Sequence, residues 1–143
     1  MKNLFLRTIL IIVLLMGCNS DNIIHSYYSF PEQNWKRFDN PIIEIDINKP
    51  GIFYDMWIEL DYDVSKTLDE FLITVIMSTP SGEIRSRNLT LDMATGDGKI
   101  RIILRKDFAF SEKGPCTFEI ENRSQNIETK GLKRIGIVLE KSK

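Results

Sequence analysis

Apolar and polar residues alternate along most of the chain after residue 41. In IIEIDI at 42–47, Ile43, Ile45 and Ile47 fall on one side and two acidic residues on the other. A period of two is typical of a β-strand with one face in a core and one in solvent. The pattern predicts seven strands, at residues 42–47, 54–62, 71–78, 88–93, 99–104, 116–121 and 134–140, with an eighth around 27–30.

Turn-forming residues separate these segments. Gly and Pro punctuate the connections at 48–51, 80–82, 96–98 and 113–115, and both residues favour turns over regular strands. Only residues 65–70 could form a short helix. Many short antiparallel strands predict an all-β fold, an antiparallel two-sheet β-sandwich, with a jelly roll as one arrangement.

Two expectations about packing follow from the same pattern. The segment at 71–78 is apolar on both sides, which is typical of a central strand covered on both faces. We expect four aromatic residues to pack the first strand onto the core, namely Tyr27, Tyr28, Phe30 and Trp35.

The first 17 residues have the order of an export signal. Lys2 and Arg7 precede an unbroken apolar run at 9–16, and the small residue Gly17 ends it. Positive, then apolar, then small residues are typical of a signal peptide. The run is far shorter than the ~20 residues that span a bilayer, so a permanent membrane helix is the weaker alternative.

The end of this signal resembles a bacterial lipobox. Leu15 lies three residues before Cys18, and Gly17 directly precedes it. The resemblance implies that the signal is cut before Cys18, that its thiol is joined to diacylglycerol, and that the new amine is acylated, for example with palmitate. Each buried CH₂ adds ~0.8 kcal/mol, so several chains anchor a protein firmly. The alternative is an ordinary signal peptide with a buried cysteine.

The chain therefore divides into a lipoprotein signal peptide at 1–17, a tether at 18–26 and a β-sandwich domain at 27–143. Nine extended residues reach about 30 Å, so the domain would stay close to its membrane. Asn19 follows the cysteine where an Asp would favour the inner membrane, and no acidic run follows. We expect an outer-membrane anchor with the domain facing the periplasm.

Composition excludes some classes of function. A hydrophobic content of 43% indicates a globular domain, and a net charge of −1 gives no general attraction to nucleic acid. The chain has two cysteines. If Cys18 carries lipid, Cys116 is single, and its strand pattern predicts a small buried hydrophobe.

Candidate chemistry is sparse, and we expect neither an enzyme nor a bound cofactor or metal. The only histidine, His25, falls in the predicted tether, whereas a catalytic triad needs a histidine on a rigid scaffold. The loop at 92–99 has two Asp residues near Gly but lacks EF-hand spacing.

A row of carboxylates leaves one enzymatic alternative open, because glycoside hydrolysis needs only a carboxylate pair. Glu59, Asp61 and Asp63 alternate on one outward face. The structural alternative is cross-strand balance by arginines. The candidates for that balance are Arg85, Arg87 and Arg101.

Trp57 lies on the same outward face, between Asp55 and Glu59. An outward Trp among carboxylates has three explanations: cover by a neighbouring loop or layer, a protein-interaction hot spot, or a platform that stacks on sugars. We take Trp57, Tyr62 and the loop at 61–70 as candidate interaction residues.

Five segments, in order along the chain, resemble the gliding-motility lipoproteins of the GldH type from Bacteroidetes. They are YYSFPEQNWKRFDNPIIEIDI at 27–47, TPSGE at 79–83, LDMATGDGK at 91–99, KGPCTFEIE at 113–121 and KGLKRIGIVLEK at 130–141. The resemblance implies a non-enzymatic, membrane-anchored envelope protein associated with gliding and its linked secretion system. The sequence thus favours binding to other envelope proteins, and a glycan-binding lipoprotein using Trp57 is the alternative.

Overall fold

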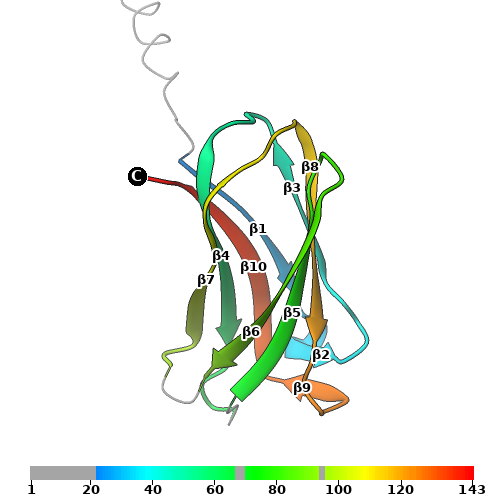
Figure 1. Cartoon of the computed structure of the whole chain (residues 1–143). Coiled ribbons are helices and arrows are strands. Elements are labelled where there is room, and N and C mark those ends of the chain that lie inside the picture. Colours follow the sequence, from blue (N-terminus) through cyan, green and yellow to red (C-terminus); the bar gives the residue numbers. More distant parts are fainter. Residues whose placement is uncertain (1–21, 67–69, 94–95) are drawn as a thin grey trace, which may run out of the picture.

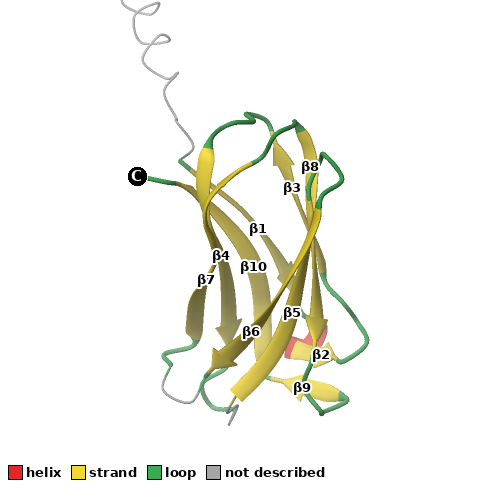
Figure 2. Ribbon diagram, viewed as in Figure 1, coloured by secondary structure: helices red, strands yellow, loops and turns green. Residues whose placement is uncertain are grey.

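The alternating segments form β-strands in the computed structural model, which describes residues 22–66, 70–93 and 96–143 (Figure 1, Figure 2). Ten strands occur in these ranges, so the predicted all-β class is confirmed. They are β1 Ile23–Ser29, β2 Asn34–Lys36, β3 Ile42–Ile47, β4 Phe53–Tyr62, β5 Glu70–Ser78, β6 Ile84–Asp92, β7 Lys99–Ala109, β8 Gly114–Asn122, β9 Glu128–Lys130 and β10 Leu132–Lys141. A 3-10 helix, η1 Pro31–Gln33, lies between β1 and β2.

Eight of these strands form two facing antiparallel sheets (Figure 1). Sheet A has the order β1-β10-β4-β7 and sheet B the order β3-β8-β5-β6, while β2 and β9 form a separate short ribbon. Without the ribbon, the strands visit the sheets in the order A, B, A, B, B, A, B, A, which is a jelly roll. The predicted sandwich is confirmed, and the jelly roll is the arrangement that it adopts.

The core lies between the two sheets and uses the alternate positions of the long strands. Ile58 on β4 and Ile137 on β10 enter it from sheet A, and Val75 on β5 and Phe118 on β8 enter it from sheet B. Each of these side chains is at most 1% exposed. Full burial of such a side chain contributes about 1.5–3 kcal/mol to the stability of the fold. The apolar positions of the period-two pattern are those whose side chains contact the opposite sheet.

Cys116 on β8 belongs to this core and is fully buried. Burial raises the pKa of its thiol to about 12. The thiol is therefore neutral at physiological pH, and the predicted small hydrophobe is confirmed.

The first strand begins earlier than the sequence predicts. β1 starts at Ile23 and pairs along its length with β10. The predicted tether at 18–26 is therefore wrong for residues 23–26, which are strand, while residues 18–21 lie outside the described residues. β1 is an edge strand, and His25 and Ser26 interrupt its apolar pattern. The period of two therefore does not show where this strand begins.

The ribbon of β2 and β9 is absent from the prediction, since three-residue strands are too short to show a period. Trp35 on β2 is 1% exposed, stacks on Phe30 at 4.8 Å and donates its indole N–H to the Asp39 carbonyl at 2.8 Å. The expected aromatic packing is confirmed for Phe30 and Trp35, and Tyr28 packs against the core half-buried. Tyr27 instead lies on the outer face of sheet A.

Strand β5 lies inside sheet B, between β8 and β6, as a central strand should. The predicted cover on both faces is wrong, because the outward side chain of Leu72 is 46% exposed. The segment before β5 gives no helix in the described residues: residues 64–66 form a turn, 67–69 lie outside the description, and β5 begins at Glu70.

Candidate functional site

The predicted lipidation site, Cys18, lies outside the described residues, and β1 begins at Ile23, shortly after it in sequence. None of the described residues form a helix long and apolar enough to cross a membrane. Within residues 22–66, 70–93 and 96–143, no three His, Cys, Asp or Glu side chains gather as metal ligands would.

Trp57 lies on the outer face of sheet A, where the sequence places it, but it is half-buried. The Arg101 guanidinium on β7 lies 4.4 Å from the centre of its ring. Arg101 also pairs with Glu59 at 3.3 Å and with Glu140 at 2.6 Å. The Arg101 guanidinium therefore already covers one face of the Trp57 ring. A cation over an indole face is favourable by about 0.5–1 kcal/mol at an exposed site.

A second group of contacts extends this network across sheet A. The Tyr27 hydroxyl donates to Glu59 at 2.7 Å, and Arg134 lies over the Tyr27 ring at 4.3 Å while pairing with Asp61. Partial burial, followed by the hydrogen bond to Glu59, raises the pKa of Tyr27 to about 12. The outer face of sheet A is thus a connected set of ion pairs and aromatic rings.

This close packing depends on Gly136 of β10. A Cβ atom added to Gly136 would meet the Tyr27 ring at 2.1 Å. Glycine therefore lets the ring lie on the strand backbone and brings its hydroxyl to Glu59. Of the predicted cross-strand cations, Arg101 does balance the carboxylates, and Arg134 is a second that the sequence pattern did not indicate.

The prediction of Tyr62 as an interaction residue is wrong. Tyr62 is 3% exposed, and its hydroxyl donates to the Met93 carbonyl at 3.3 Å. The reason is strand parity, because Tyr62 shares the inward face of β4 with Ile58 and Leu60. In the adjoining loop, Asp63 accepts hydrogen bonds from the Ser65 hydroxyl at 2.8 Å and the Ser65 amide at 2.9 Å, and these lower its pKa.

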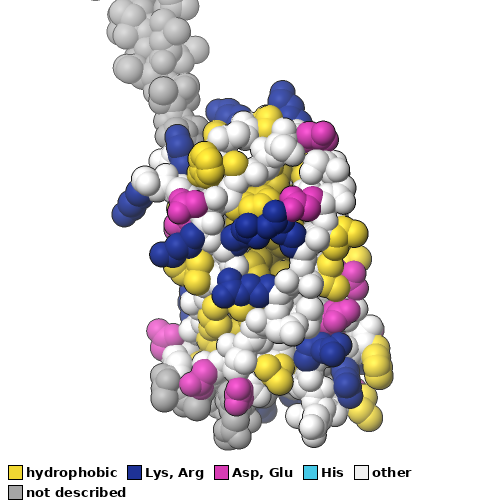
Figure 3. Space-filling view, viewed as in Figure 1, with side chains coloured by type: hydrophobic (Ala, Val, Ile, Leu, Met, Phe, Trp, Pro, Cys, Tyr) yellow, Lys and Arg dark blue, Asp and Glu magenta, His cyan; other side chains and the backbone are white. Residues whose placement is uncertain are grey.

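A different surface is hollowed, at the side of the sandwich where β6 and β7 lie at the ends of their sheets. A cavity of about 190 Å³ opens there. Four apolar side chains from both sheets form its floor, and three arginines line its rim. The floor is Met56, Val75, Met77 and Leu104, and the rim is Arg85, Arg87 and Arg105. We call this site the arginine cleft; Figure 3 shows basic side chains lying across an apolar hollow on this face.

The register of β6 explains why two arginines reach the cleft. Arg85 pairs opposite Met77 and Arg87 opposite Val75, so both arginines project to the inner side of sheet B with those apolar residues. The next residues of the same parity, Leu89 and Leu91, are buried. The arginines therefore continue the core-facing row of β6 beyond the point where sheet A covers it.

The third arginine reaches the cleft through an irregularity between β4 and β7. The register shifts on both sides of Met56, which lies opposite Arg105. Asp107, at φ 50°, donates its amide to the Asp55 carboxylate at 3.0 Å, and this bond chiefly lowers the pKa of Asp55. Bulges commonly redirect a side chain, and this one puts Arg105 on the same side as Leu104.

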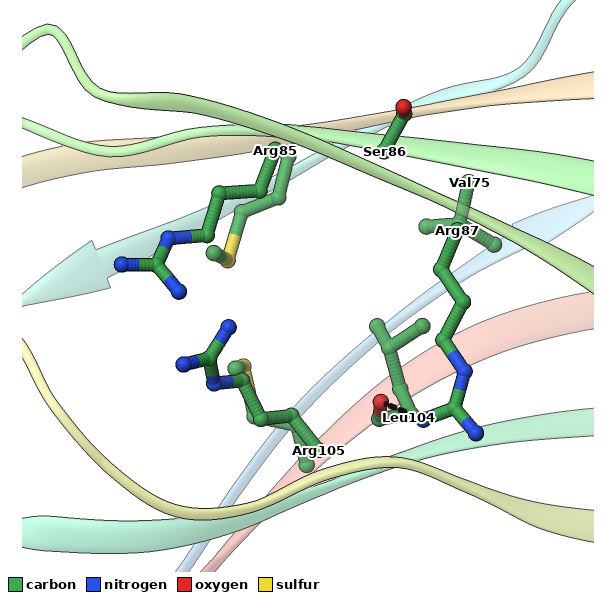
Figure 4. Close-up of a pocket in the computed structure, with 8 residues that line it drawn as sticks. Val75, Arg85, Ser86, Arg87, Leu104 and Arg105 are labelled. Carbon is green, nitrogen blue, oxygen red and sulfur yellow. Dashed lines mark hydrogen bonds between the residues drawn. The ribbon is translucent and has the colours of Figure 1, made fainter.

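The rim cations differ in their contacts (Figure 4). Arg87 reaches across the gap and donates to the Leu104 carbonyl. Arg85 pairs with Glu83, which directly precedes β6. Arg85 and Arg105 point toward each other in Figure 4, and both lie near the Phe108 ring, at 5.4 and 5.0 Å.

The described residues form a small jelly-roll domain with the arginine cleft at one side. More specifically, the sequence model of the GldH lipoprotein family matches residues 22–139. The chain belongs to this family. The predicted resemblance is confirmed, and membership identifies a membrane-associated lipoprotein of the cell envelope, of the gliding-motility type.

Other comparisons add little. No curated protein sequence matches the chain. One solved structure, the infectious bursal disease virus VP2 subviral particle, is similar with a TM-score of 0.48 and 11% identity, over 85% of this chain and 34% of that one. The chain thus spans about a third of that structure, and a likeness at this level supports no inference on function.

Proposed function

We propose that this chain is a non-enzymatic, lipid-anchored envelope protein that binds other proteins of the gliding-motility and linked secretion machinery. The observation that carries the proposal is the family match over residues 22–139. The acylated Cys18 is the anchor, in an outer membrane whose periplasmic side the domain faces. The four residues between Cys18 and Ile23 reach about 14 Å, so the folded domain would lie against that membrane.

A binding role also agrees with the contacts of the carboxylates and the histidine that were candidates for catalysis. Glu59 and Asp61 hold cations and a tyrosine hydroxyl instead of facing an open pocket. His25 lies exposed on the edge strand β1. These contacts support a rigid body that offers surfaces to partners, with the arginine cleft as the binding site.

Metabolic labelling with a clickable fatty acid tests the anchor. The wild-type protein should be labelled and remain with the membrane fraction, and Cys18→Ala should be unlabelled. Equal labelling of both proteins, or of neither, would contradict anchoring at Cys18. Crosslinking in intact cells should then connect the anchored protein to motility or secretion components, and recovery of none would contradict the proposed role.

The glycan alternative has less support. The Arg101 guanidinium occupies one face of the Trp57 ring, so a sugar stacked on that face would have to displace a cation with two carboxylate partners. A glycan array decides between the two roles. Specific sugar binding that disappears in Trp57→Ala would favour the alternative over protein binding.

A further inference from the structure

We infer that the arginine cleft binds an extended acidic segment of a partner protein, with one apolar side chain of that segment inserted into the cavity. The inference rests on the proposed binding role and gives the chemistry of the partner. Three features of the cleft carry it: the charge of its rim, the size of its cavity and its place between two strand edges.

The rim has positive charge in excess of its local partners. All charged residues that line the cavity are arginines. Among the described residues, Glu83 is the one carboxylate paired with them, and it pairs with Arg85. Arg105 faces Arg85 beside Phe108, and no carboxylate of the described residues pairs with it. Guanidinium groups bind carboxylates in a bidentate manner, so a partner carboxylate would offset the repulsion between the two arginines.

The size of the cavity favours one side chain over a whole small molecule. Its volume is about 190 Å³, whereas pockets that enclose small-molecule ligands have about 300–1,000 Å³. A cavity of about 150 Å³ holds a benzene ring. With Met77 and Leu104 in its floor, the cleft suits a single leucine or phenylalanine side chain.

The position of the cleft favours an extended segment, because the unpaired edge of a strand can pair with another extended chain. The cleft lies between β6 and β7, each of which is the last strand of its sheet. Inward-pointing charges can also protect such edges from pairing, and Arg87 fits that structural role because it donates to the Leu104 carbonyl on β7. Within the part of the chain that the structure describes, Arg85 and Arg105 make no such bond across the gap, so we assign the carboxylate contacts to them.

The test measures binding of a fluorescent pentapeptide, Glu-Asp-Leu-Glu-Asp, to the full-length protein in lipid nanodiscs. Saturable binding should weaken by about tenfold or more in the double variant Arg85→Gln/Arg105→Gln, since both charge-assisted contacts to the peptide carboxylates are lost. The matched double variant Arg37→Gln/Arg123→Gln removes two charges that do not line the cleft, one beside Phe38 and one paired with Glu121, and should bind within about twofold of wild type. The peptide Glu-Asp-Gly-Glu-Asp, which lacks the apolar side chain, should bind less tightly than the first.

Charge exchange separates recognition from folding. Arg85→Glu/Arg105→Glu should lose the acidic peptide and gain binding of Lys-Lys-Leu-Lys-Lys, which a merely unfolded variant would not do. Equal weakening in both double Gln variants, or no saturable binding to wild type, would overturn the inference. Arginine-dependent binding of octyl phosphate without binding of the peptide would overturn it in favour of an anionic amphiphile. If the peptide fails while crosslinking in cells still recovers machinery components, the inference fails and the proposed function stands.

Discussion

The outer face of sheet A and the arginine cleft both contain arginines beside aromatic rings, yet their electrostatics differ. On sheet A, Arg101 and Arg134 each lie over a ring and each pair with carboxylates. In the cleft, Arg105 lies by Phe108 and faces another arginine above an apolar floor. The charges on sheet A therefore already pair with one another, whereas among the described residues the cleft has three arginines and one paired carboxylate.

The largest effect is expected for a substitution in the closed core, compared with one at the edge of the sandwich beside the arginine cleft. Leu139→Ala, at a fully buried position, should lower the free energy of unfolding by about 4 kcal/mol. Leu104→Ala, at a position that borders the open cleft, should lower it by about 2 kcal/mol, because a side chain beside an opening loses fewer packing contacts. Denaturant unfolding of the two variants gives both values. Equal losses would show that the edge is as closed as the core.

The next effect concerns the close packing on sheet A. Gly136→Ala should destabilise the fold by about 2 kcal/mol, since the new methyl group would meet the Tyr27 ring. Displacing Tyr27 also breaks its bond to Glu59. The double variant Tyr27→Ala/Gly136→Ala is the control. Its loss in the free energy of unfolding, measured with denaturant, should be smaller than the sum of the losses in Tyr27→Ala and Gly136→Ala. Losses that add up would show that residues 27 and 136 do not interact.

Removing one arginine from each surface tests the comparison directly. Arg101→Gln should cost about 1 kcal/mol in the free energy of unfolding, because Glu59 and Glu140 lose their shared, partly exposed cation. Arg105→Gln should change it by less than about 0.5 kcal/mol, or stabilise the fold, because it removes repulsion from Arg85. A larger cost at Arg105 than at Arg101, measured by thermal and chemical unfolding, would reverse the assignment of the two surfaces.

The last expected effect is a pH dependence on sheet A. Tyr27 has a pKa of about 12 in the folded protein, against 10.0 ordinarily, so folding favours its protonated form. Its contribution to stability is complete below pH 10 and is lost as pH rises toward 12. The stability difference between wild type and Tyr27→Phe should therefore shrink between pH 9.5 and pH 11.5, values chosen to bracket roughly the first half of the titration. A difference that stays constant would argue against the Tyr27–Glu59 bond.

Much of the fold could be predicted from the sequence because strand parity is a local signal. Ile43 and Ile45 alternate with Glu44 and Asp46 because the two isoleucines face the opposite sheet. Parity fails for short or edge elements, which explains the missed ribbon of β2 and β9 and the late start assigned to β1. The parity of β4 also puts Tyr62 on the buried face with Leu60, which conflicts with the choice of Tyr62 as an interaction residue.

The candidate site was less predictable. Arg85 and Arg87 share the parity of Leu89 and Leu91, and that alternation could have indicated core-facing arginines. What the sequence did not show is that sheet A leaves those positions uncovered. The position of Arg105 depends on a register shift at Met56 and on the Asp55–Asp107 bond, which are tertiary features without a local pattern.

Photocrosslinking in living cells tests directly whether a partner protein binds at the arginine cleft. A benzoylphenylalanine is placed at position 87, because the Arg87 side chain lines the cleft on the same side of β6 as Arg85, and is compared with one at His25 on sheet A. We expect a crosslink to an envelope protein from position 87 that disappears in Arg85→Gln/Arg105→Gln, and none from position 25. A crosslink from position 25 alone, or one from position 87 that survives loss of both arginines, would contradict the proposed binding at the cleft.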